Sequence, residues 1–77
     1  METKSQYKSA IRSRKLIKNA FSRLLQKKDF EKITVTEIVK LSGLNRGTFY
    51  AHYSNVVDVL EEIEREVTDN ILSLFSS

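Results

Sequence analysis

The sequence contains no cysteine, no proline and no tryptophan, and it has only two glycines and one histidine. The lack of cysteine excludes a disulfide framework, a thiolate metal site and a cysteine nucleophile. Because glycine and proline are the residues that most often interrupt regular structure, their scarcity favours helices joined by short turns. No apolar run approaches the roughly 18 residues that a membrane-spanning helix needs. We therefore expect a small all-α domain in the cytoplasm that makes no contact with a membrane.

What the 77 residues do contain is one modest apolar core and an uneven distribution of charge. Residues 1–32 hold ten Lys or Arg against three Asp or Glu, whereas residues 56–77 hold one against six. A basic end and an acidic end on one short chain suggest that one surface meets a polyanion. The alternative is that both ends are solvated helix faces, since charge governs association rather than fold.

Apolar residues recur at helical spacing in four segments, at about residues 10–28, 35–42, 45–52 and 55–74. Residues 1–9 lack this periodicity, and we expect them to form a basic N-terminal arm. The last segment carries an apolar stripe opposite its acidic face: Val56, Leu60, Ile63, Val67, Ile71 and Leu74. The prediction is a three-helix helix-turn-helix bundle of homeodomain-like type over residues 10–54, followed by a fourth, connecting helix over residues 55–77.

The signals at the helix ends place a tight corner between the second and third helices. Thr34 and Glu37 have the spacing of a capping box, so they predict the start of the second helix. Gly43 follows that helix where a residue able to adopt a positive φ is favoured, and Asn45 can cap the next helix. Two short helices around such a turn make a helix-turn-helix.

The third helix has two different faces. Phe49 and Tyr53 point the same way and are predicted to be buried, while Gly47 and Ala51 point the opposite way. A helix that lies in a DNA major groove needs its backbone close to the bases, and this nearly flat outer face permits it. The alternative is that Gly47 marks a fraying helix with ordinary core aromatics. The predicted recognition helix comprises Asn45, Arg46, Gly47, Thr48, Phe49, Tyr50, Ala51 and His52.

Over residues 14–63 the sequence resembles the DNA-binding domain of TetR/AcrR-type transcriptional repressors. The residues that carry the resemblance are Leu16-Ile17 and Ala20-Phe21, Thr34-Val35-Thr36-Glu37-Ile38-Val39, Ser42-Gly43-Leu44, Thr48-Phe49-Tyr50-Ala51-His52-Tyr53, and Leu60. The chain departs from the family pattern at Asp29, where glycine is usual, at Val39, where alanine is usual, and at Val56, where a phosphate-binding lysine is often found.

The resemblance implies sequence-specific binding to double-stranded DNA, with repression of one operator and the third helix in the major groove. It implies DNA contacts by Thr36, Asn45, Arg46, Gly47, Thr48, Tyr50 and His52, with Arg46 and Thr48 as the best candidates for base contacts. Asn55 and the helix dipole would serve in place of a lysine at Val56. The basic N-terminal third adds Arg14 and Lys15 as candidates for phosphate contacts.

The same resemblance implies a homodimer in the full-length protein, and a small-molecule effector bound only by a C-terminal domain that this chain lacks. We expect the chain as given to be monomeric or weakly associating, and to be an excised domain rather than an unusually short relative.

Other classes of function are disfavoured by the residues. The lone His52 beside tyrosines is typical of a structural role, and the last helix's glutamates lack histidine partners for a metal. No phosphate-binding glycine loop or nucleophile motif is present. We therefore predict no enzyme activity, no metal and no cofactor. The alternative to DNA binding is a helical protein-interaction module that uses the apolar face of the fourth helix.

Overall fold

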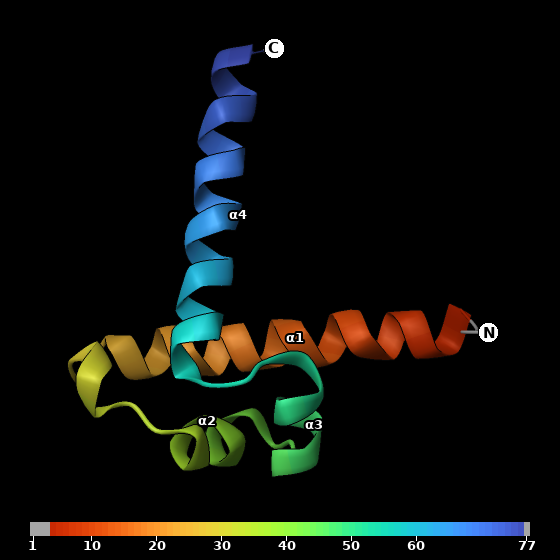
Figure 1. Cartoon of the computed structure of the whole chain (residues 1–77), viewed down its shortest axis with the longest axis vertical. Helices are drawn as coiled ribbons and strands as arrows, with labels where there is room; N and C mark the ends of the chain where they lie inside the picture. The colour runs from red at the N-terminus through yellow and green to blue at the C-terminus, as the bar shows by residue number, and fades with distance from the viewer. Residues whose placement is uncertain (1–3, 77) are drawn as a thin grey trace.

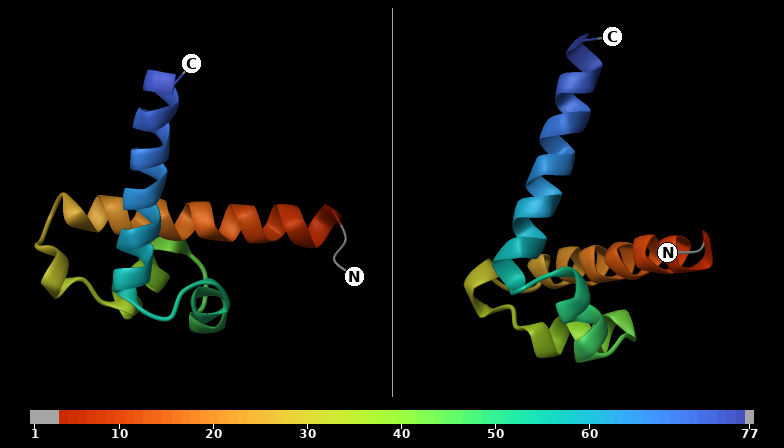
Figure 2. Two further views of the ribbon diagram at one scale, coloured as in Figure 1. Left: turned by 45° about the horizontal axis from the view of Figure 1, so that its top comes forward. Right: turned by 45° about the vertical axis from the view of Figure 1, so that its right-hand side comes forward.

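The computed structural model describes residues 4–76, which form four α-helices and one short 3₁₀-helix. Their bounds are α1 Lys4–Leu25, η1 Phe30–Lys32, α2 Val35–Ser42, α3 Arg46–His52 and α4 Val56–Ser76. The short helices α2 and α3 lie on one side of α1, and α4 crosses α1 and rises away on the other side (Figures 1 and 2). The result is a thin molecule of 39 × 39 × 17 Å, in which α4 rises from between the two ends of α1 (Figure 1). The predicted all-α class is confirmed.

Helix α1 differs from its prediction at both ends. It begins at Lys4, so the described part of the expected N-terminal arm, residues 4–9, is helical; residues 1–3 lie outside the described residues. These positions contain no helix breaker and include good helix formers such as lysine and glutamine. At the other end, α1 stops at Leu25 rather than near residue 28, because the next turn is tighter: the N–H groups of Gln26 and Lys27 bond to the carbonyls three residues before them, those of Arg23 and Leu24.

All four α-helices contribute to one core. Its buried members are Ile17, Ala20, Phe21, Ile33, Ile38, Phe49, Tyr53 and Val59. Burial of Phe49 and Tyr53 confirms the predicted inner face of α3. Leu41 of α2 is exposed.

The apolar stripe predicted for α4 is only partly correct. Val59, which the stripe omitted, is fully buried, whereas Val56, Leu60 and Ile63 only pack against the edge of the core. Beyond Ile63 the helix leaves the bundle, and its apolar side chains there are between 48% and 86% exposed: Ile71, Val67, Leu72, Leu74 and Phe75. Periodicity along one helix indicates a face, but it does not indicate how far the partner helices extend.

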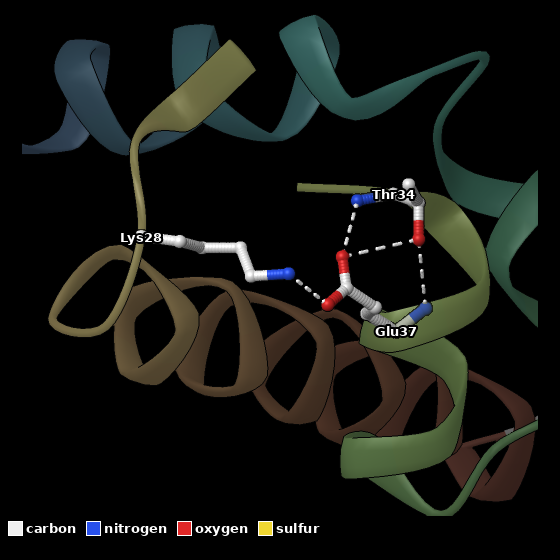
Figure 3. A network of polar contacts seen from close by, with 3 residues as sticks. All are labelled: Lys28, Thr34 and Glu37. Atoms are coloured by element: carbon white, nitrogen blue, oxygen red, sulfur yellow. Dashed lines mark hydrogen bonds and ion pairs between the residues drawn. The ribbon is translucent and has the colours of Figure 1, made fainter. Parts of the chain in front are cut away.

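The start of α2 is fixed by a three-residue polar network (Figure 3). The predicted capping box is confirmed: the N–H of Glu37 donates to Thr34 Oγ1 at 3.2 Å, and the N–H of Thr34 donates to Glu37 Oε1 at 3.1 Å. The ammonium of Lys28, just after α1, binds the other oxygen of the same carboxylate. Glu37 therefore ties the start of α2 to the end of α1.

Caps also fix the remaining turns, and those at Gly43 and Asn45 are the predicted ones. Gly43 has φ 76° in the left-handed region and closes α2, as expected of a glycine in that position. Asn45 Oδ1 accepts the N–H of Thr48 at 2.8 Å and so caps α3. Asn55 Oδ1 accepts the N–H of Asp58 at 3.0 Å at the start of α4. Each short connection thus ends on a side-chain cap.

We predict that Glu37→Gln makes the domain less stable, and more so at neutral than at acidic pH. The ammonium of Lys28 and the N–H of Thr34 hold the pKa of Glu37 below its usual value. A carboxylate with a lowered pKa stabilises the fold above its unfolded pKa of about 4.3 and loses that effect as the pH falls through the folded value. The melting temperatures of the wild type and of Glu37→Gln should therefore differ more at pH 7 than at pH 3.

The matched control is Glu64→Gln, which removes an exposed carboxylate from α4. Its melting temperature should stay close to that of the wild type at both pH values. An equal deficit of Glu37→Gln at pH 7 and pH 3 would contradict the proposed ionic contribution.

Candidate nucleic-acid interface

The outer surface of α3 has low relief. Gly47 and Ala51 are exposed opposite the buried ring of Phe49, and Tyr50 is 51% exposed on one shoulder. Thr48, on the other shoulder, is half-buried. This arrangement leaves backbone and small side chains at the centre of an exposed helix face, with a hydroxyl group on each side.

Gly47 has a local role that the sequence did not reveal. A Cβ atom at this position would lie 3.3 Å from Asn45 Oδ1, the oxygen that caps α3. That contact is tighter than usual, so a larger residue would press on the cap. Gly47 therefore protects the start of α3 as well as flattening its outer face.

Arg46 and Thr36 lie together although ten residues separate them in the sequence. Arg46 Nη2 donates a hydrogen bond to Thr36 Oγ1, which links the first turn of α3 to the first turn of α2. Both residues are exposed. The helix-turn-helix corner thus presents a guanidinium and a hydroxyl group side by side, a combination suited to a phosphate.

On its other side, α3 borders a groove of about 510 Å³ against α1. Its lining residues are Ser9, Ala10, Ser13, Asn45, Gly47, Thr48, Ala51 and His52. Ser9 and Ser13 are not among the predicted site residues, because the expected arm, residues 1–9, separates Ser9 from the helix that holds Ser13. Their spacing of four residues, which places two hydroxyl groups on one helix face, was the available signal.

Arg14 lies elsewhere, on the side of α1 that faces α4. It lines a second groove, of about 280 Å³, together with Tyr53, Glu61, Glu62 and other residues of α4. Lys15 borders the same side and lines a groove with Lys18, Glu62 and Glu66. The structure therefore does not bring Arg14 and Lys15 to the outer face of α3.

The junction of α1 and α4 is held by polar contacts. Lys18 forms an ion pair with Glu66 at 2.8 Å. The hydroxyl group of Tyr53 donates to Glu62, and burial together with this carboxylate raises the pKa of Tyr53 well above its usual value. This hydrogen bond links the end of α3 to α4.

His52 and Asn55 are placed at the edges of this surface. His52 is half-buried and lines both grooves, so it lies between α1, α3 and the start of α4. Asn55 is exposed, but its side-chain oxygen is used by the cap of α4. Asn55 therefore has a structural role in the cap of α4, whereas His52 borders both grooves.

Neither a metal centre nor a membrane segment is found in the described part of the chain. Among residues 4–76, no three His, Cys, Asp or Glu side chains gather closely enough to hold a metal ion. Over the same residues, no helix combines the length and the apolar character needed to span a bilayer.

Comparisons with known proteins identify the family of this chain. Residues 17–63 match the family described as bacterial regulatory proteins, tetR family. The chain is also 36% identical, over 52 residues, to YxbF of Bacillus subtilis (strain 168), an uncharacterized HTH-type transcriptional regulator. That match covers 66% of this chain and 14% of the relative. No solved structure matches.

Proposed function

Because this chain belongs to the tetR family of bacterial regulatory proteins, we propose that it binds an operator in double-stranded DNA and represses transcription, with α3 in the major groove. The observation that carries this proposal is the α2–Gly43–α3 corner, which leaves the small outer face of α3 exposed beside the Arg46–Thr36 pair. Direct readout of bases requires such an exposed helix face. Such binding places the protein in the cytoplasm.

Phosphate contacts are assigned to the two borders of α3. Towards α2, Thr36, Arg46 and Tyr50 expose a hydroxyl, a guanidinium and a phenol group. Towards α1, Thr48 borders the groove with Ser9 and Ser13. Hydroxyl and guanidinium groups are typical phosphate donors, and such contacts fix the register of a protein on the duplex. His52 and Asn55 lie at the margins of this footprint.

Among the basic residues of α1, Arg12 is placed better than Arg14 to approach the duplex. At 100° per residue, Arg12 lies about 160° around the helix from Arg14, and both lie about 100° from Ser13 of the groove. Arg12 is exposed, whereas Arg14 lies near the carboxylates of α4. The contribution of Arg14 and Lys15 to DNA binding remains a prediction, and we expect it to be the smaller one.

A second candidate function rests on the exposed part of α4. Val67, Ile71, Leu72 and Phe75 are between 48% and 86% exposed, as expected of a surface that packs against protein. The chain spans only 14% of the length of its curated relative. We infer that the full-length protein is a homodimer whose C-terminal part covers this face and binds a small-molecule effector. A protein-interaction module that uses only α4 is the alternative.

A salt titration tests whether the basic face of α1 meets phosphate. Arg12→Ala should reduce the slope of log K against log salt by about one unit for a mixed-sequence duplex, because one fewer counterion is released. The pair Arg14→Ala and Lys15→Ala, made together, should reduce the slope by less than one unit. The slope is measured for the wild type and for both variants by fluorescence anisotropy between about 50 and 200 mM salt.

Arg65→Ala is the matched control, since this exposed arginine lies on α4. It should leave the slope unchanged. A slope that responds to Arg65→Ala and not to Arg12→Ala would place the polyanion on α4 and contradict the proposed interface.

Pairing of two chains should turn weak binding into operator binding. One recognition helix reads one half-site, whereas paired helices about 34–36 Å apart read two. Joining two copies through their C-termini can raise avidity by roughly 10²–10⁴-fold without a new contact. We expect the paired chain to enrich a site from random duplexes, and Thr48→Ala to weaken binding to that site more than binding to random DNA.

The single chain provides the comparison. It should bind DNA weakly, with strong salt dependence and little preference for the enriched site. If the single chain already prefers that site by a factor of about a thousand, a typical specificity ratio, dimerisation is not what provides specificity.

A further inference from the structure

The structure limits which bases α3 can read, if the proposed DNA binding holds. In the major groove, guanine is usually read by a bidentate arginine or lysine, and adenine by a bidentate asparagine or glutamine. Near the start of α3, the chain offers one residue of each kind, Arg46 and Asn45. Both side chains already have a partner within the domain.

Arg46 is directed towards α2 rather than across the outer face. It lies about 60° around the helix from the buried Phe49, whereas Gly47 and Ala51 each lie about 160° from Phe49. Its guanidinium donates to Thr36 Oγ1. This location suits a phosphate at the border of the groove, where a contact carries no sequence information.

Asn45 is occupied by the cap of α3. Its Oδ1 atom accepts the N–H of Thr48 at 2.8 Å. A bidentate contact to adenine would require this oxygen as the acceptor and the amide nitrogen as the donor. Reading adenine in this way would therefore uncap a helix of only seven residues.

What remains at the centre of the outer face is almost entirely apolar. Gly47 presents backbone, Ala51 presents a methyl group, and Thr48 adds a methyl and a hydroxyl group. The thymine 5-methyl group is the one apolar feature on the base edges of the major groove, and alanine and threonine methyls are its usual partners.

We propose that α3 specifies its operator through thymine methyl groups, which contact Ala51 and Thr48, and that Arg46 binds phosphate instead of guanine. The half-site then contains T·A pairs where the centre of α3 meets the groove. Tyr50 lies about 40° from Arg46 around the helix, so its hydroxyl belongs to the same phosphate-facing border. This inference rests on the proposed function and adds the chemistry of readout to it.

Deoxyuridine tests the proposal, because it lacks only the methyl group of thymidine. The site enriched by the paired chain is used whole, and each thymine of one half-site is replaced in turn. At one or two positions, the affinity of the paired chain should fall about three- to fivefold, the loss expected for one buried methyl group. Replacing guanines by 7-deazaguanine should have no comparable effect.

Two variants assign the contact to the protein. Ala51→Gly removes the partner methyl, so the difference between thymine and uracil should disappear at one position. Arg46→Gln should weaken binding to the selected half-site and to random DNA by the same factor. The matched control is Asn70→Gly, which introduces a glycine into the exposed part of α4 and should keep the full loss of affinity when thymine is replaced by uracil. Circular dichroism checks that each variant is folded.

The outcomes distinguish a failure of the proposed DNA binding from a failure of the thymine-methyl readout. No binding to any duplex at low salt would overturn the proposed function itself. Binding that no uracil substitution weakens, but that 7-deazaguanine weakens, would overturn the methyl readout and leave DNA binding intact. Binding with no enriched site, or a uracil effect that persists in Ala51→Gly, would also overturn the assigned contact.

Discussion

Burial of one large apolar side chain from each helix is the constraint on which the structure depends. Phe21 of α1, Ile38 of α2, Phe49 of α3 and Val59 of α4 are all fully buried in one cluster. Each such burial contributes about 1.5–3 kcal/mol, against a net stability of only about 5 kcal/mol for a small domain. Helices of eight and seven residues do not form alone, so this cluster is what holds α2 and α3 in place.

The arrangement of charge follows from the same packing. Because Val59 fixes the start of α4 against α1, the carboxylates of α4 lie next to one side of α1, where Glu66 pairs with Lys18 and Glu62 accepts from Tyr53. That side of α1 is therefore partly neutralised. Arg12 lies about 160° around the helix from Arg14 and is exposed, so that flank of α1 keeps its positive charge.

Local features could be predicted from the sequence, whereas contacts between helices could not. The capping box at Thr34, the left-handed Gly43 and the inner face of α3 each depend on a few neighbouring residues, and all were predicted correctly. Burial of Val59 and the Arg46–Thr36 bond depend on how separate helices cross. The periodicity of one segment contains no information about that crossing. The early start of α1 was missed for a related reason: a helix that extends beyond the bundle needs no apolar stripe.

The central claim is that the outer face of α3 is the surface that meets DNA. The most direct test is a titration of the isotopically labelled chain with a mixed-sequence duplex, followed by amide chemical shifts. The proposed interface predicts that the resonances of Thr36, Gly47, Thr48 and Ala51 shift, while those of the exposed half of α4 stay in place. Shifts confined to α4, with α3 unaffected, would contradict it.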